Sequence, residues 1–126
     1  MKSLSYGEFG LIEQIRRRFG DIPAPGMTGI GDDCAIIPLK GDSSLVVTTD
    51  MLVEQVHFLR SHIPPFDLGY KSLAVNLSDV AAMGASPFAS FLSVALPDDL
   101  PQEWIEAFME GYHALSAQYG VPLLGG

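Results

Sequence analysis

Two adjacent carboxylates, Asp32 and Asp33, stand between a glycine pair and an apolar run in the stretch GIGDDCAIIP. Neighbouring negative charges repel each other, and the repulsion grows where apolar surroundings lower the dielectric constant. The glycines allow a ligand to approach the backbone, and exposed amides in such a loop suit phosphate. The segment also fits an ordinary polar turn before a strand, and its spacing does not decide which of the two aspartates is a ligand.

Two further acidic motifs follow or interrupt apolar elements. Thr48, Thr49 and Asp50 close the β-rich run SLVVTTD, and hydroxyl and carboxylate oxygens are hard ligands suited to Mg²⁺. Asp79 shares a face with Asn76 in a helix candidate that is apolar on most sides, so we expect it to be buried and to need a partner. The ordinary alternatives are a turn after a strand for the first motif and a salt bridge for the second.

Considered together, these acidic motifs indicate a metal site. Their carboxylates lie at strand ends and on a buried helix, where they can converge, while the chain has 7 Lys and Arg against 15 Asp and Glu. The formal net charge of −8 disfavours nucleic acid or a bare anion as a direct ligand. Several Mg²⁺ ions would supply the missing positive charge and bridge the carboxylates to nucleotide phosphates.

The remaining residue of chemical interest is His57, in the run VEQVHF. A lone histidine in a strand is often structural, but a place shortly after Asp50 also suits a substrate pocket. No serine–histidine–aspartate triad is evident, and Cys34 has no base nearby in sequence. We therefore expect no catalytic nucleophile.

Apolar periodicity predicts the elements that must position these groups. We expect helices at 6–19, 67–83 and 102–119, the first of them opened by a capping box of Ser5 and Glu8. Between them lie β-rich runs: CAIIP, SLVVTTD, MLVEQVHF, FASFLSVALP and VPLL. The turn KGDSS predicts a hairpin between the first two. The expected fold is one α+β domain with a mixed four-stranded sheet and helices packed on one face.

Length and composition fit one globular domain in a reducing compartment. The chain has 126 residues, 48% of them hydrophobic and 17% charged, which suffices for a single core. With one cysteine, no signal-peptide pattern and no apolar run of about 18 residues, we expect a cytoplasmic protein without a membrane partner. The end VPLLGG is typical of a strand entering a glycine loop, and we expect that loop to continue beyond Gly126.

Four motifs in order, GIGDDCA, TTDMLVEQVHF, YKSLAVNLSDVAAMGASP and LLGG, resemble the thiamine-monophosphate kinase family. More broadly they are similar to the N-terminal half of the superfamily that contains aminoimidazole ribonucleotide synthetase and selenophosphate synthetase. The segment NLSDVAAMGA is shared across that superfamily, whereas TTDMLVEQVHF with its histidine indicates the thiamine enzymes. The resemblance implies transfer of the γ-phosphoryl group of ATP to thiamine monophosphate, giving thiamine diphosphate with the help of several Mg²⁺ ions.

The resemblance also implies roles for individual residues. The Mg²⁺ ligands correspond to five oxygen-bearing side chains of the acidic motifs: Asp33, Thr48, Thr49, Asp50 and Asp79. The family pattern thus selects Asp33 over Asp32. His57 corresponds to a substrate contact, and Gly125 with Gly126 to the start of a nucleotide-phosphate loop. No residue is expected to act as a general base, because the attacking phosphate oxygen is already ionised at neutral pH.

On this resemblance, residues 1–126 form an N-terminal domain that binds Mg²⁺ and nucleotide and mediates dimerisation, and the C-terminal domain of the family is absent. Family members are homodimers whose N-terminal sheets pair into a closed barrel, which also covers sheet edges. Two alternatives stay open: another ATP-dependent enzyme of the superfamily, acting like selenophosphate or aminoimidazole ribonucleotide synthetase, and a dimerisation module without catalysis. We expect the 126 residues alone to be inactive, because the site is incomplete.

Overall fold

The computed structural model describes residues 7–126. They fall into two compact units, the first ending at Val47 and the second spanning Thr48–Gly126. The expected capping residue Ser5 and the first expected helical residue, Tyr6, lie outside the described residues. No helix among residues 7–126 is both long enough and apolar enough to cross a membrane.

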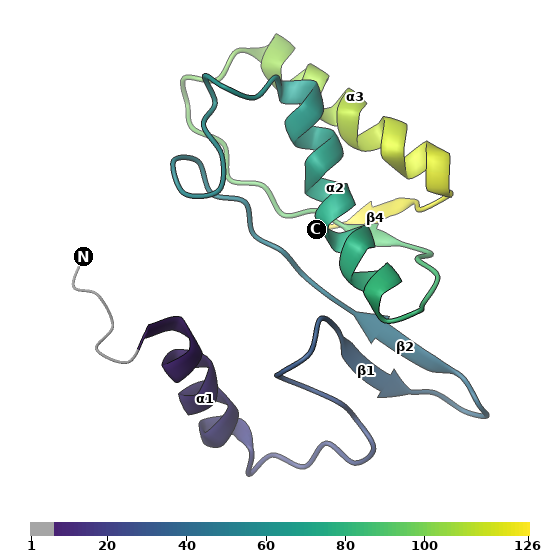
Figure 1. Ribbon diagram of the computed structural model, residues 1–126. Helices are drawn as coiled ribbons and strands as arrows, with labels where there is room; N and C mark the ends of the chain where they lie inside the picture. The colour runs from purple at the N-terminus through teal and green to yellow at the C-terminus, as the bar shows by residue number, and fades with distance from the viewer. Residues whose placement is uncertain (1–6) are drawn as a thin grey trace. The chain divides into compact units, whose positions relative to one another are not determined.

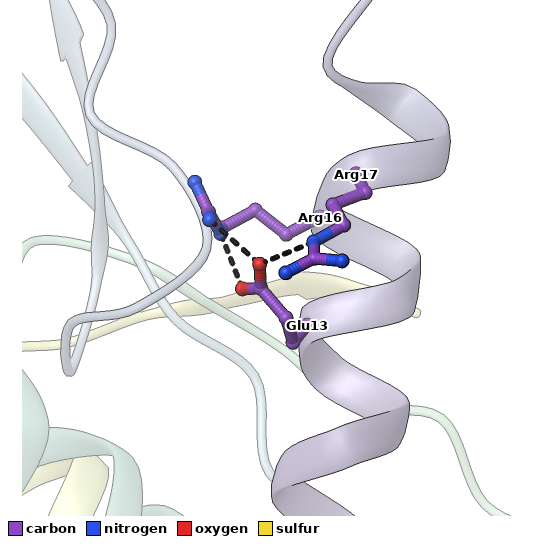
Figure 2. A network of polar contacts seen from close by, with 3 residues as sticks. All are labelled: Glu13, Arg16 and Arg17. Carbon is purple, nitrogen blue, oxygen red and sulfur yellow. Dashed lines mark hydrogen bonds and ion pairs between the residues drawn. The ribbon is translucent and has the colours of Figure 1, made fainter.

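Helix α1 (Gly7–Phe19) forms where the sequence predicts it and carries three arginines in its last turn, where positive charge interacts favourably with the helix dipole. Glu13 accepts hydrogen bonds of 2.7 to 2.9 Å from Arg16 and Arg17 (Figure 2). These bonds, first that of Arg16 and then that of Arg17, lower the pKa of the Glu13 carboxyl to about 2. The apolar side chains of α1 are exposed to different degrees: Phe9 is 87% exposed, whereas Ile12 is 37% exposed.

The predicted hairpin is confirmed. Strands β1 (Ala35–Pro38) and β2 (Ser44–Val47) pair antiparallel over their full length. In the loop between them the Leu39 amide donates to the carbonyl oxygen of Ser43 at 2.9 Å. Gly41 has a φ of +79°, a conformation that glycine adopts without steric cost. The turn residues in KGDSS thus end one strand and start the next.

The second unit is built on two helices that lie side by side, α2 (Pro65–Ala82) and α3 (Gln102–Tyr119) (Figure 1). Two glycines allow their backbones to approach closely. A Cβ on Gly69 would lie 1.9 Å from the carbonyl oxygen of Phe108, and a Cβ on Gly111 would lie 1.8 Å from a carbonyl oxygen of α2. No side chain fits at either position, so the contact between the two helices requires glycine at both.

The core of the second unit lies between these helices and a short sheet. Its cluster contains buried and partly buried apolar side chains: Leu73, Tyr112, Leu115, Ala74, Leu77 and Leu92. The Tyr112 hydroxyl donates to Ser90 Oγ at 2.8 Å and so joins α3 to strand β3 (Ser90–Phe91). Strand β4 (Leu123–Gly125) pairs parallel with β3. The buried Val121, just before β4, fixes the chain as it leaves α3.

The expected single sheet of four strands is wrong for the described residues. The strands form two separate two-stranded sheets, β1 with β2 and β3 with β4. The run FASFLSVALP contributes only two strand residues, and the segment after β2 leaves the sheet at Val47. A strand exists only where a partner completes its hydrogen bonds, and β propensity alone does not supply that partner. The α+β class and the predicted helices are confirmed.

The run MLVEQVHF is a turn rather than the predicted strand. The carbonyl oxygen of Val53 accepts hydrogen bonds from the amides of Val56 and His57 at 3.1 and 2.8 Å. The Gln55 amide donates to the Phe58 carbonyl oxygen at 2.7 Å. Gln55 has a φ of +65°, which reverses the chain and ends the extended conformation. The partial alternation of apolar residues in this run did not reveal that reversal.

Candidate metal centre

Asp79 and Thr48 meet although 31 residues separate them in the sequence. The Thr48 hydroxyl donates to Asp79 Oδ2 at 3.5 Å, a long hydrogen bond between two partly buried side chains. Asp79 is carried by the last turns of α2, whose buried residues, Leu68, Gly69 and Leu73, lie in its first half. The expectation that Asp79 is buried is therefore only partly correct, because the residue is partly buried and retains some access to solvent.

Asp50 lies close to Asp79, whose carboxylate acts on the Asp50 carboxyl. The pKa of Asp50 is raised, first by partial burial of its carboxyl, then by the negative charge of Asp79 and a hydrogen bond between the two groups. The charge of His57 acts in the opposite direction. A raised pKa means that the protein disfavours the anionic form of Asp50, so a cation bound between the two carboxylates would relieve the repulsion.

The oxygen atoms brought together here fit Mg²⁺ better than a metal that needs a closed cage of protein ligands. Among residues 7–126 there is no group of three or more His, Cys, Asp and Glu side chains that could hold a metal ion. Mg²⁺ is typically held by one or two carboxylates together with substrate phosphates and water. Asp50 and Asp79, with the Thr48 hydroxyl beside them, provide such a partial set. Thr49, which lies between Thr48 and Asp50 in the sequence, is exposed. Its role as a metal ligand stays a prediction.

The first acidic motif belongs to the other unit, where Asp32 and Asp33 are both exposed. Asp32 Oδ1 accepts a hydrogen bond of 2.8 Å from the backbone amide of Asp33. Asp32 therefore stabilises its own turn, a local role common for aspartate. This contact distinguishes Asp32 from Asp33, which sequence spacing alone could not do. The assignment of Asp33 as a metal ligand stays a prediction.

Asn76 lies one helical turn before Asp79 on α2. Its side-chain amide donates to the Ser72 carbonyl oxygen at 3.0 Å, whereas its Oδ1 is buried without a hydrogen-bond partner among residues 7–126. A buried carbonyl without a partner costs about 1–3 kcal/mol. The spacing between Asn76 and Asp79 showed that they share a face, but no sequence signal indicated that this oxygen lacks a donor.

The two terminal glycines lie beside β3. The carbonyl oxygen of Gly125 accepts a hydrogen bond from the Leu92 amide at 2.8 Å. A Cβ on Gly126 would lie 1.7 Å from the Leu92 carbonyl oxygen. Glycine is thus needed at Gly126 for close backbone packing, and a role in binding nucleotide phosphate stays a prediction for both residues.

His57 is exposed in the turn described above, and its Nδ1 accepts a hydrogen bond of 2.9 Å from the Val53 amide. Arg60 joins this turn to a later segment of the same chain. Its Nε lies 3.0 Å from Glu54 Oε1, and its Nη2 lies 3.4 Å from Asp99 Oδ2. Sequence reasoning selected His57 but missed Gln55, whose positive φ shapes the turn. Glutamine carries no sequence signal for that conformation, which glycine and asparagine adopt more readily.

Known proteins resemble this chain over almost its whole length. Residues 31–126 match the family model for AIR synthase related protein, N-terminal domain. The chain is 44% identical over 123 residues to a thiamine-monophosphate kinase of Salmonella typhimurium and 42% identical to one of Escherichia coli K12. These alignments cover 98% of the chain but 37% of each relative. The chain therefore spans well under half the length of these curated relatives.

Solved structures agree with these sequence matches. One described as AaThiL complexed with AMPPCP and TMP has a TM-score of 0.85 and 37% identity to this chain. The crystal structure of a thiamine monophosphate kinase from Aquifex aeolicus has a TM-score of 0.75 and 32% identity. Each comparison covers the entire chain and 38% of the other protein. This chain thus shares its α+β fold with one part of each of those larger proteins.

Proposed function

Because this chain belongs to the family of AIR synthase related proteins, as their N-terminal domain, we propose that it forms the metal- and nucleotide-binding part of a thiamine-monophosphate kinase. The larger enzyme transfers the γ-phosphoryl group of ATP to thiamine monophosphate and releases thiamine diphosphate. The names of relatives at 42–44% identity support this reaction. A structural neighbour bound to AMPPCP, an analogue of ATP, and to TMP supports the two substrates.

The observation that carries the proposal is the pairing of Asp50 with Asp79 next to the Thr48 hydroxyl. Phosphoryl transfer between two anions needs their mutual repulsion neutralised and their oxygens aligned, and it needs little covalent chemistry from the protein. When bound between Asp50 and Asp79, Mg²⁺ would supply that neutralisation. A partial set of carboxylate and hydroxyl ligands leaves positions open for those oxygens.

Each predicted residue has a task in this reaction. The proposed metal ligands are five oxygen-bearing side chains of the three acidic motifs: Asp33, Thr48, Thr49, Asp50 and Asp79. His57 contacts thiamine monophosphate and positions it. Gly125 and Gly126 begin the loop that holds the nucleotide phosphates through its backbone amides. No side chain needs to remove a proton, because the attacking phosphate oxygen is ionised.

The assembly in which this occurs is a homodimer, and the remaining ligands come from the C-terminal part of the larger protein. Residues 1–126 contribute the dimerisation surface, on which the sheets of two protomers pair into a barrel. The cytoplasm is the proposed location, since ATP and Mg²⁺ are both supplied there. The 126 residues alone are then inactive, because part of the ligand set is missing.

The test uses the full-length protein with Mg–ATP and thiamine monophosphate, and measures thiamine diphosphate. Asp79→Asn removes one charge from the carboxylate pair and should lower kcat/KM by roughly 100-fold or more. Asp98→Asn, a change at an exposed aspartate in the same unit, serves as the matched control and should leave activity unchanged. If the folded protein binds ATP but forms no thiamine diphosphate, the substrate assignment is wrong, and the other acceptors of the superfamily become the candidates.

A further inference from the structure

The peptide groups of Val53 hold His57 at two points. The Val53 amide donates to Nδ1 of the His57 ring at 2.9 Å, and the Val53 carbonyl oxygen accepts the His57 backbone amide at 2.8 Å. The first bond fixes the ring and the second fixes its backbone. These two bonds tie the ring position to the local turn.

The bond to Nδ1 also decides which ring nitrogen carries the proton. A nitrogen that accepts an N–H must present its lone pair, so the neutral His57 ring carries its proton on Nε2. Nε2–H has no hydrogen-bond acceptor among residues 7–126, and the residue is exposed. In this state His57 offers a hydrogen-bond donor to an acceptor from outside the described chain.

Gln55 sets the conformation that makes this arrangement possible. Its φ of +65° is unusual for a residue with a side chain, and it allows the Gln55 amide to reach the Phe58 carbonyl oxygen at 2.7 Å. Arg60 contacts Glu54 at 3.0 Å and thereby holds the start of the turn. A backbone conformation that is disfavoured in isolation persists only where its surroundings support it, and such positions often serve binding sites.

We propose that Gln55 and the Val53 peptide are positioning elements that keep His57 as the Nε2–H tautomer, so that it donates a hydrogen bond to an anionic phosphate oxygen of the acceptor substrate. A proton added to His57 would act on the Asp50 carboxyl and lower its pKa, so the ring lies within electrostatic reach of the candidate metal centre. That the hydrogen-bond acceptor is a phosphate oxygen of the substrate rests on the proposed kinase function. The Nε2–H tautomer and its origin in the Val53 and Gln55 turn do not rest on it.

The tautomer is tested directly by nitrogen-15 NMR of the histidine ring in the 126-residue chain. His57 should show protonation of Nε2 and a free lone pair on Nδ1. Gln55→Gly keeps the turn, since glycine adopts positive φ readily, and should leave this pattern intact. Gln55→Val places a β-branched residue at positive φ and should shift His57 to a mixture of tautomers. Protonation on Nδ1 in the unmodified chain, or no change in Gln55→Val, overturns the proposal.

The consequence for binding is tested in the full-length enzyme. Gln55→Val should raise KM for thiamine monophosphate by about tenfold with kcat nearly unchanged, because a hydrogen bond to a charged oxygen is lost in both ground and transition states. Gln55→Gly should leave both constants unchanged. His57→Gln keeps a nitrogen donor at the ε position and should retain more affinity than His57→Asn, which places it at the δ position. Equal activities for these two variants overturn the donor role, and this pair decides the matter if Gln55→Val does not fold.

The two proposals fail in distinguishable ways. A folded full-length protein without kinase activity, but with Nε2–H on His57, contradicts the proposed function and leaves the positioning role in place. The donor is then probed with inorganic phosphate and Mg²⁺, which should shift the Nε2 resonance in the unmodified chain and not in Gln55→Val. An active kinase whose His57 carries its proton on Nδ1 contradicts the positioning role alone.

Discussion

At the scale of single residues, Asp50 beside Asp79 makes the stability of the chain depend on pH, and we expect the same pair to make it depend on Mg²⁺. The pKa of Asp50 is raised in the folded chain, chiefly by partial burial and then by Asp79. Its anionic form is thus less favourable in the folded than in the unfolded state, and the resulting loss of stability is complete at pH values above the folded pKa. As the pH falls through that pKa, Asp50 takes up a proton in the folded state and the loss disappears.

We therefore predict that Asp50→Asn stabilises the metal-free chain at pH 7 by less than about 1 kcal/mol, the effect being small because the residue is exposed, only part of its carboxyl is buried, and solvent screens the rest. The gain should vanish in acid, where the unmodified Asp50 is protonated. Mg²⁺ should raise the unfolding temperature of the unmodified chain and have little effect on Asp50→Asn. Thermal unfolding with and without Mg²⁺, with Asp98→Asn as control, measures both effects. An equal response to Mg²⁺ in all three proteins would place the ion elsewhere.

At the scale of elements, the contact between α2 and α3 depends on Gly69 and Gly111. A Cβ at either position would overlap a carbonyl group of the facing helix, at 1.9 and 1.8 Å respectively. Such an overlap involves backbone atoms, so it can be relieved only if the helices move apart and the core between them opens. The helices therefore hold the candidate site indirectly, because α2 carries Asp79.

Gly69→Ala and Gly111→Ala should each lower the free energy of unfolding by about 1–3 kcal/mol or more, the range of an overpacked core, despite the better helix propensity of alanine. Urea unfolding followed by circular dichroism measures the change. Gly29→Ala is the matched control, since a Cβ there meets no atom within 4 Å. Stabilisation by either helix substitution would mean that α2 and α3 do not approach as closely as described.

The helices and strands differ in how well the sequence predicts them. Helices α2 and α3 follow from apolar periodicity, and the β1–β2 hairpin follows from its turn residues, because these signals are local. Convergence of all the acidic motifs was predicted from their places at the ends of apolar elements; of these, Asp50 lies close to Asp79, and the ligand roles stay predictions. The turn at 53–58 was missed because a glutamine at positive φ carries no local signal. The four-stranded sheet was wrong because strand pairing depends on distant partners.

At the scale of the whole molecule, the short parallel sheet carries large apolar side chains that are mostly exposed among the described residues of the second unit. Phe91 on β3 is 71% exposed, and Leu124 on β4 is 62% exposed. Nearby, Phe88 and Val94 are 67% and 57% exposed. A two-stranded sheet also has unpaired backbone groups along its edges, and pairing with a second chain satisfies them. These features agree with the proposed pairing of sheets between two protomers.

We predict that Phe91→Asp weakens that dimer strongly while the monomer stays folded, because the exposed Phe91 contributes little to the core. Burying a phenylalanine contributes about 1.5–3 kcal/mol, and a symmetric interface contains the residue twice. The dimer dissociation constant should therefore rise by roughly 100-fold or more, as measured by sedimentation at several concentrations. Phe9→Asp changes a phenylalanine on α1 that is 87% exposed, and should leave association unchanged. A monomeric unmodified chain, or equal weakening by the α1 variant, would show that the β3–β4 surface does not join the protomers.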